Sequence, residues 1–365
     1  MNIGKGVYFY CCPYEKPDKA AYQHACVGLA EGLRELGVPV FSDTPYWRES
    51  LEPGACLFNP SPGVHPADCA AVVLNDRWFS YGREFPRELR PRKGGYALVY
   101  LDLEDGIVTR SWDRAFRAFD LILKSHFSRG VRYPPNCRPW AFGLTNRILA
   151  ETGSPPPFEK RKREIVCNFR HGHYLRRIAN RQFLPMLQDI LAVDSAVDDF
   201  SDRPADPFQL LQWSQTGRRH YPQYYRRLRE SAACSCFGGC FVAPFPRDPS
   251  SGVARLVNRF IQDRGLRTRT VVQYDSFRLW EALAAGAVVF HVDFDRYGVQ
   301  LPVMPENWKH YIGIDLDRPD RAVTRLRQSV ELLAAVSESG RAWAAAHYSP
   351  RATAERFLGW LEQKA

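Results

Sequence analysis

One stretch, residues 273–292, constrains the fold more than any other part of the chain. It has the sequence QYDSFRLWEALAAGAVVFHV, in which a short loop, a helix and a strand follow one another directly. Phe277, Trp280 and either Leu283 or Ala284 recur at helical spacing, and Gly286 suits the position just past a helix end. The apolar run that follows is typical of a strand buried on both faces of a parallel sheet. The stretch therefore predicts an α/β protein.

Arg278 is the residue that does not fit a purely structural helix. It lies in the first turn, where the positive end of the helix dipole disfavours a cation unless an anion lies nearby. A residue that breaks such a local charge preference beside a loop indicates a binding site. The alternative is an amphipathic core helix, capped by Asp275 or Ser276, in which Arg278 and Glu281 pair with each other one turn apart on the polar face.

The first half of the chain alternates apolar strands with helical patterns. Predicted strands cover 7–11, 38–41, 70–74, 96–101 and 121–124, and predicted helices cover 23–36 and 112–119. This order predicts a doubly wound sheet. No GxGxxG motif follows the first strand, so the sequence does not indicate a dinucleotide site there.

The best domain boundary is the segment 151–163, which combines a proline run with a basic run. A length of 365 residues fits two domains. After the boundary, the patterns predict strands at 164–168, 232–236 and 311–315, and helices at 253–262, 322–336 and after Ser349-Pro350. We therefore predict an N-terminal domain at 1–150, a linker at 151–163, a second domain at 164–348 and a C-terminal helix at 349–365.

Charge and cysteine content limit the partners and the compartment. A net charge of +10 favours an anionic partner such as nucleic acid, a membrane surface or a phosphorylated small molecule. No apolar stretch has the length of a signal sequence or a spanning helix, so we expect a cytoplasmic protein, with peripheral contact at the cytoplasmic membrane face as an alternative. The ten cysteines are spread along the chain as reduced core residues would be. Cys234, Cys236 and Cys240 lack paired CxxC spacing, so no metal site is predicted.

Two motifs in the last third of the chain carry a family resemblance. ACSCFGG at 233–239 is followed by DSFRLWEALAAGAVV at 275–289. Together they resemble the C-terminal donor-binding half of GT-B glycosyltransferases, as in glycosyltransferase family 1-like domains, and they are most similar to the exostosin-like branch. The resemblance implies two Rossmann-like domains that face each other across a cleft, with a C-terminal helix that crosses back to the first domain.

The same resemblance implies a transferase that moves a sugar from a nucleotide-sugar donor to a glycan, a lipid-linked molecule or another hydroxyl acceptor. It implies that Glu281 binds ribose or sugar hydroxyls, and that Ser276, Tyr274 and the helix start lie at the donor, where a diphosphate would explain Arg278. Neither a metal nor another cofactor is expected. Three further candidates for donor binding follow from the chain itself: Asn168, Arg170 and His171. They lie where a predicted strand leads into a helix, which is the usual ligand position in open α/β sheets.

The sequence departs from the resemblance at one position. Retaining GT-B enzymes often carry two glutamates separated by seven residues, and Gln273 stands at the position of the first. Retention and inversion therefore both stay open. Inversion needs a base on the acceptor side, and the acidic loop after the strand at 96–101 supplies the catalytic candidates Asp102, Glu104 and Asp105, with Asp18, His24 and His126 behind them.

Two other functions compete with this one. The basic, tyrosine-rich stretch 218–229 could bind nucleic acid through arginines and stacked aromatic rings, or it could be an amphipathic surface helix. No base-reading motif occurs in it, so we expect no nucleic-acid partner. In a rival fold, termed GT-A, Asp102-x-Glu104-Asp105 would coordinate a divalent cation that bridges the donor diphosphate.

Overall fold

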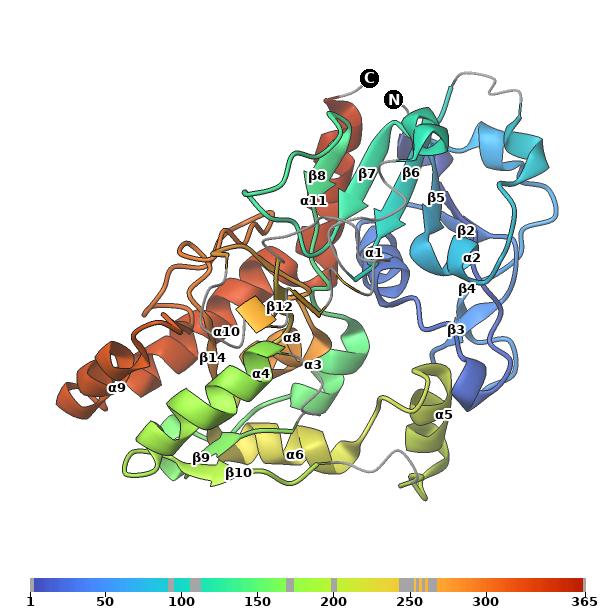
Figure 1. The fold of residues 1–365 in the computed structure, drawn as a ribbon. Helices are drawn as coiled ribbons and strands as arrows, with labels where there is room; N and C mark the ends of the chain where they lie inside the picture. Colours follow the sequence, from blue (N-terminus) through green and yellow to red (C-terminus); the bar gives the residue numbers. More distant parts are fainter. Residues whose placement is uncertain are drawn as a thin grey trace.

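Two parallel sheets, one in each half of the chain, form the framework of the protein (Figure 1). The computed structural model describes residues 3–90, 95–105, 113–168, 174–197, 202–242 and 268–363, together with residues 253, 256, 257, 260 and 261. Two small antiparallel pairs, β3–β4 and β12–β13, accompany the sheets. Their strands are β3 (Tyr46–Arg48), β4 (Cys56–Phe58), β12 (Cys240–Phe241) and β13 (Val271–Val272).

The first sheet has six strands in the order β2-β1-β5-β6-β7-β8, and all neighbours are parallel. The strands are β1 (Val7–Phe9), β2 (Val40–Ser42), β5 (Ala71–Asn75), β6 (Ala97–Asp102), β7 (Leu121–Lys124) and β8 (Cys137–Pro139). Alternate residues enter two different cores: Val7 and Phe9 pack on one face, and Tyr8 packs on the other. Burial on both faces explains the continuous apolar runs in the sequence.

The second sheet has five parallel strands in the order β10-β9-β11-β14-β15. They are β9 (Lys162–Val166), β10 (Ala192–Asp194), β11 (Ser231–Ser235), β14 (Val288–Val292) and β15 (Ile312–Ile314). Each half is thus a Rossmann-like unit, as expected from the alternation of strands and helices.

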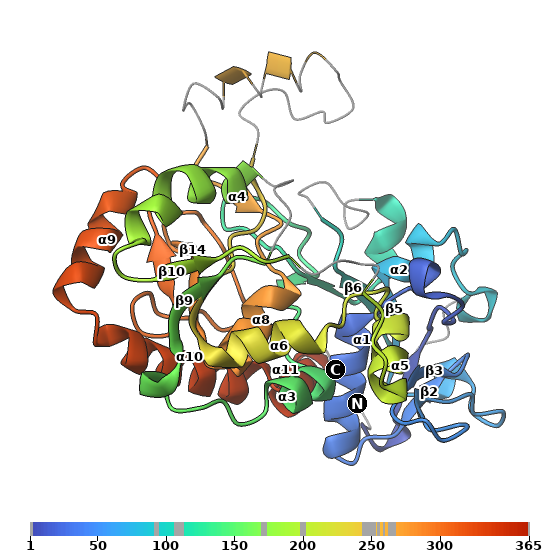
Figure 2. The same cartoon turned by 90° about the horizontal axis from the view of Figure 1, so that it is seen from below.

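Helices pack on both sheets and one of them joins the two halves. They are α1 (His24–Glu35), α2 (Asp76–Ser80), α3 (Asn146–Thr152), α4 (Tyr174–Ile178), α5 (Pro207–Gln215), α6 (Pro222–Glu230), α8 (Phe277–Ala284), α9 (Pro319–Gln328), α10 (Leu332–Tyr348) and α11 (Pro350–Glu362). Although α11 follows the second sheet, Ala354, Phe357 and Leu361 pack into the core of the first. Figures 1 and 2 both show α11 beside α1, so the predicted crossing of the C-terminal helix is confirmed.

Several predicted helices differ from the observed ones. The helix expected at 322–336 is two helices, because α9 ends at Gln328 and α10 begins at Leu332. The segment 112–119 contains a 3₁₀ helix (Arg114–Ala118) and no α-helix in its described part. Most of the helix expected at 253–262 lies outside the described residues. Among the described helices, none has both the length and the apolar run required to cross a bilayer.

Candidate functional site

The strand order of the second sheet marks the place where a ligand is expected. The chain runs from β9 outward to β10 and then returns to form β11 on the other side of β9. In open α/β sheets, ligands bind beyond the carboxyl ends of the strands at such a reversal. Asn168 follows β9 and Cys236 follows β11, and the start of α8 lies against both residues. The Arg278 side chain donates a hydrogen bond to the main-chain carbonyl of Asn168. The Cys236 thiol donates to the main-chain carbonyl of Arg278.

The start of α8 carries a buried hydroxyl that has no partner among the described residues. Ser276 is the N-cap residue, with extended backbone angles, but its side chain caps no backbone N–H. Its Oγ atom is buried and has no hydrogen-bond partner in the part of the chain that the structure describes. Nearby Gln273 has φ of +61°, a conformation that costs energy in a non-glycine residue and is concentrated at functional sites. Gly286, with φ of +69°, ends the helix as predicted.

Two guanidinium groups converge at this helix start. Arg278 donates to the main-chain carbonyl of Asn168, and Arg176 of α4 donates from Nε to the carbonyl of Phe237 at 2.9 Å. Burial, reinforced by the nearby charge of Arg278, lowers the pKa of Arg176 to about 10. Two partly buried cations beside a helix N-terminus create a positive potential that suits a diphosphate.

Arg176 is a residue that the sequence alone did not single out, because an arginine beside Arg177 looks like part of a solvated basic face. Arg177 is indeed exposed, whereas Arg176 turns toward the sheet. Of the three candidates predicted here, Asn168 contributes a main-chain carbonyl. Arg170 and His171 lie outside the described residues.

Glu281 is buried and does not lie on an exposed polar face, so that expectation is wrong, whereas its role in binding donor hydroxyls stays a prediction. Its side chain is only 7% exposed and accepts a hydrogen bond from the hydroxyl of Tyr225 at 2.7 Å. Arg147 of α3 lies 3.8 Å away and also donates to Tyr225. Burial raises the pKa of Glu281, and the charge of Arg147 opposes that rise. A carboxylate held in this way supports the packing of α8 against α6 and α3.

Tyr274 and Asp275 connect the second domain to the first. The Tyr274 hydroxyl is buried between the carbonyl oxygens of Phe127 and Gln300, at 2.9 and 2.8 Å. The Asp275 carboxylate accepts hydrogen bonds from the Phe142 backbone N–H and from the Trp280 indole, both at 2.7 Å. Burial raises the pKa of Asp275 to about 6. The structure thus gives Tyr274 a role in joining the domains, and its place at the donor stays a prediction.

The three acidic candidates of the first domain have very different surroundings. Asp102 and Lys124 are fully buried and lie 3.4 Å apart, because β6 and β7 pair these two residues. Asp102 also accepts the Glu104 backbone N–H, so its carboxylate belongs to the interior and is withdrawn as a candidate base. Glu104 is partly buried, whereas the Asp105 side chain is 65% exposed.

Asp105 lies beside a histidine that also contacts the second domain. Its Oδ1 atom is 3.3 Å from Nε2 of His126, and Nδ1 of His126 accepts the backbone N–H of Asp275. That bond leaves the hydrogen of a neutral His126 on Nε2. The other two reserve candidates have different surroundings. His24 is fully buried with both ring nitrogens hydrogen-bonded, and Asp18 is exposed in a 3₁₀ helix.

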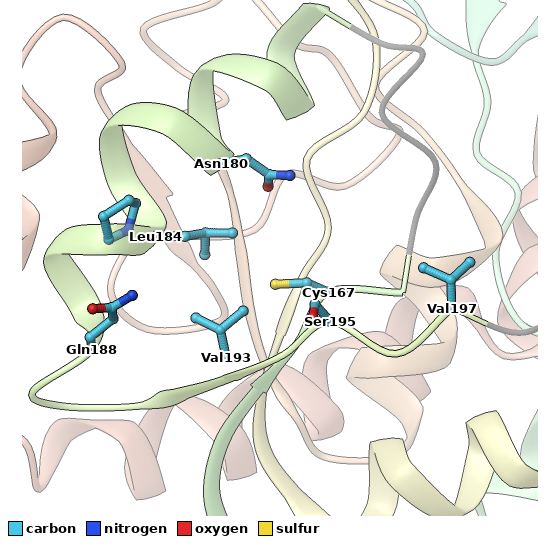
Figure 3. A pocket seen from close by; sticks show the side chains of 8 residues that line it. Cys167, Asn180, Leu184, Gln188, Val193, Ser195 and Val197 are labelled. Atoms are coloured by element: carbon cyan, nitrogen blue, oxygen red, sulfur yellow. The ribbon is translucent and has the colours of Figure 1, made fainter.

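A cavity of about 220 Å³ opens next to the end of β9 (Figure 3). Its walls come from Cys167, just after β9, from the helical segment after α4, and from β10 and the loop that follows. Six of the side chains that line it are Cys167, Asn180, Leu184, Gln188, Val193 and Ser195. Burial raises the pKa of the Cys167 thiol to about 12, so this wall is neutral. Among the described residues, no group of three or more His, Cys, Asp or Glu side chains could hold a metal ion.

Solved glycosyltransferases share this architecture over nearly the whole chain. An alpha-glucosyltransferase in complex with UDP and a 13-mer DNA containing a central A:G mismatch superposes with a TM-score of 0.53 over 98% of this chain and 99% of that chain, at 8% identity. AviGT4, a glycosyltransferase involved in Avilamycin A biosynthesis, superposes with a TM-score of 0.50 over 98% and 97%, at 15% identity. Neither family models nor curated protein sequences match the chain.

The chain has the GT-B fold. The predicted fold class is confirmed, and the rival GT-A architecture is excluded, because Asp102-x-Glu104-Asp105 follows a strand of the first of two separate sheets. The motifs that resemble the exostosin-like branch occupy β11 and the α8–β14 unit of this GT-B fold. Membership of that branch stays a prediction.

The stretch proposed for nucleic-acid binding is an amphipathic helix. Tyr224, Tyr225 and Leu228 of α6 are buried in the core of the second domain. Bases stack on exposed aromatic rings, so these tyrosines cannot serve that purpose. Arg227 pairs with Asp194 at 2.7 Å. The alternative of an amphipathic helix is therefore confirmed for this stretch.

Proposed function

We propose that the protein is a glycosyltransferase that uses a nucleoside-diphosphate sugar as donor. One observation carries the proposal: Arg278 and Arg176 converge beside the N-terminus of α8, at the strand-order reversal of the second sheet. Cationic side chains and helix N-termini are the groups that hold diphosphates without a metal ion. The GT-B fold supports the assignment by analogy, since the solved neighbours named above are glycosyltransferases.

Each group at this site would have a distinct role. The N-terminus of α8 and the Ser276 hydroxyl would donate to the diphosphate oxygens, and the two guanidinium groups would offset the charge that develops on the leaving diphosphate. Donation to a diphosphate would give the buried Ser276 hydroxyl a partner. We propose that the reaction needs no metal, because these groups can supply the electrostatic stabilisation.

The acceptor is expected to bind on the side of the first domain. There, Asp105 is the exposed carboxylate of the three candidates, and it is the group that would take the proton of an acceptor hydroxyl in an inverting reaction. A retaining reaction would leave Asp105 with a binding role. A glycan, a lipid-linked molecule or another hydroxyl compound remains the proposed acceptor, and no nucleic-acid acceptor is proposed.

Thermal unfolding with a panel of ligands tests the proposal. A ligand that binds only the native state raises the melting temperature by mass action, by about 2.7 kcal/mol of apparent stability at one hundred times Kd. We expect stabilisation by a nucleoside diphosphate and its sugars, and UDP is the first to try because UDP is bound in a solved neighbour. Sugar transfer or hydrolysis should persist in excess chelator. Stabilisation by DNA, lost steeply with salt, and none by nucleotides would contradict the proposal.

A further inference from the structure

One short stretch of the second domain gathers a large share of the exposed apolar side chains. Ten large hydrophobic side chains are exposed among the described residues, and four of them lie within positions 253–260: Val253, Leu256, Val257 and Phe260. Their exposed fractions are 73, 70, 41 and 56%. Single exposed apolar residues are ordinary on a protein surface, whereas a group of them marks an interaction site.

These four side chains share one side of a helix and form what is termed here the exposed apolar face. All four residues are helical in the structure. Leu256, Val257 and Phe260 follow Val253 by three, four and seven positions, which is the spacing of an apolar stripe along a helix. Such a stripe normally packs on the core of its own domain. Here it is exposed, so its partner is expected outside the chain.

The exposed apolar face lies in the connection between two paired strands. β12 and β13 are antiparallel, with Cys240 opposite Val272. The Val242 backbone N–H donates to the Thr270 carbonyl at 2.8 Å, which extends the pairing at the base of the connection. Figure 2 shows the described pieces of the connection (gold) projecting beyond α4, away from both sheets. The exposed apolar face is therefore presented outward from a paired base.

The base of this connection lies beside the proposed donor site and the first domain. The next residues after β13 are Gln273, with its positive φ, and the loop that ends at the N-cap Ser276 of α8. A Cβ atom at Gly130, in the loop after β7, would come within 2.8 Å of the Thr270 hydroxyl. A partner bound at the exposed apolar face would thus lie on the side of the molecule where the two domains meet.

The charge of the connection indicates the chemistry of that partner. Residues 243–270 include six arginines and two aspartates, and they include neither lysine nor glutamate. Arg255 and Arg259 stand between the apolar residues in the sequence. Helices that lie in a membrane interface combine an apolar face with basic residues, because apolar insertion and attraction to anionic lipids add to each other. The exposed apolar face and its basic sequence context together fit an anionic lipid surface.

Two other partners fit these observations less well. A stable protein–protein interface takes about 20–30 residues a side, whereas the exposed apolar face has four, and a second copy of the chain would bring the same excess of arginines. Nucleic acid binds through stacking on aromatic rings as well as through cations. Val253, Leu256 and Val257 offer no ring, so nucleic acid leaves most of the exposed apolar face unexplained.

We propose that the exposed apolar face docks the protein on an anionic lipid bilayer, with its four side chains inserted at the boundary between headgroups and acyl chains. The inference goes beyond the proposed function and does not rest on it, because docking requires neither donor nor transfer. It gives the peripheral membrane contact considered for the sequence a location in the fold.

Co-sedimentation of the full-length protein with vesicles tests the docking surface. One set of vesicles contains phosphatidylcholine alone, and the other contains phosphatidylcholine with phosphatidylglycerol. Val253→Gln combined with Leu256→Gln removes the two most exposed side chains of the face and keeps the net charge. The matched control combines Leu51→Gln with Val197→Gln, at two apolar positions that are 50 and 54% exposed.

We expect wild type and the control to bind the vesicles that contain phosphatidylglycerol, more weakly as salt is raised, and to bind phosphatidylcholine alone at least about tenfold less tightly. The Val253→Gln, Leu256→Gln variant should lose at least about tenfold in affinity for the anionic vesicles, because two apolar side chains no longer enter the bilayer. Both substituted positions are exposed, so circular dichroism and the melting temperature should match those of wild type.

Several results would overturn the inference. Wild-type protein that sediments with neither kind of vesicle would do so, as would a Val253→Gln, Leu256→Gln variant that binds like wild type, or an equal loss in the control. Self-association in sedimentation velocity that the variant abolishes, without vesicle binding, would instead identify a contact between copies of the chain. Nucleotide titration tests the proposed function separately, so either proposal can fail without the other.

Discussion

The Nδ1 atom of His126 accepts the backbone N–H of Asp275 at 3.1 Å, and this bond connects the end of β7 in the first domain to the start of α8 in the second. His126 is 1% exposed and has φ of +54°, a strained conformation that the surrounding structure must hold in place. The Asp275 carboxylate binds back to the Phe142 backbone. The helix that carries Arg278 is therefore positioned by residues of the first domain.

Substitution of this histidine should destabilise the protein. His126→Phe removes the acceptor and leaves the buried Asp275 N–H without one, which typically costs about 1–3 kcal/mol. We expect a loss of this size in the free energy of unfolding by urea. His65 also accepts a backbone N–H, from Ala67, but it is exposed to water, so His65→Phe is a matched control with little expected effect. Equal losses in both variants would contradict the cross-domain role.

Arg147 should be essential for stability, because it is the buried cation beside Glu281. Its side chain is 4% exposed, and it donates to His220, Tyr225 and Tyr22. Removal of one partner of a buried ion pair costs about 3–5 kcal/mol. We expect Arg147→Met to lose stability in that range, Arg147→Met with Glu281→Leu to recover part of it, and the exposed-site control Arg138→Met to change little. Additive losses of stability in the double variant would refute the coupling between Arg147 and Glu281.

Glu31 should make stability depend on pH. Burial raises its pKa to about 8, while its carboxylate accepts the backbone N–H of Asn146 at 2.7 Å. A carboxyl whose pKa is higher in the folded state binds its proton more tightly there. Its contribution to the free energy of unfolding is therefore full below the pKa of the unfolded state, about 4.3. The contribution is lost as the pH rises toward 8. Glu31→Gln keeps an acceptor and cannot titrate.

The measurement compares wild type with Glu31→Gln in urea unfolding from pH 5 to pH 9. As the pH rises, the free energy of unfolding of wild type should fall relative to that of Glu31→Gln by up to about 1.4 kcal/mol per pH unit. This relative loss should level off above pH 8. A difference that is constant across this range would show that Glu31 has an ordinary pKa in the folded protein.

The contact of α11 with α1 can be tested with two glycines. A Cβ atom at Gly32 would come within 1.9 Å of the Pro350 carbonyl oxygen, whereas a Cβ at Gly359 would meet no atom within 4 Å. Gly32→Ala should therefore separate the two helices and destabilise the protein. Gly359→Ala should be neutral or stabilise by up to about 1 kcal/mol, since alanine favours helix. Similar melting temperatures for both variants would refute the predicted packing.

Much of this fold could be predicted from local patterns, since buried parallel strands are continuous apolar runs. The strand 121–124 and the helix start at Phe277 were found in this way. Side-chain partners could not be predicted, because they depend on register and on distant elements. The pairing of Asp102 with Lys124 follows from the alignment of β6 with β7. The burial of Glu281 follows from Tyr225, which comes from a helix far away in sequence.

The central claim is that Arg278 holds the donor diphosphate, and calorimetric titration of nucleoside diphosphates tests it most directly. A hydrogen bond to a charged group is worth about 1.5–3 kcal/mol, so Arg278→Ala should bind the preferred nucleotide about 10 to 100 times more weakly. Arg177→Ala removes an exposed cation from α4, next to Arg176, and should bind as wild type does. If folded Arg278→Ala keeps wild-type affinity for every nucleoside diphosphate that wild type binds, the donor site is not at α8.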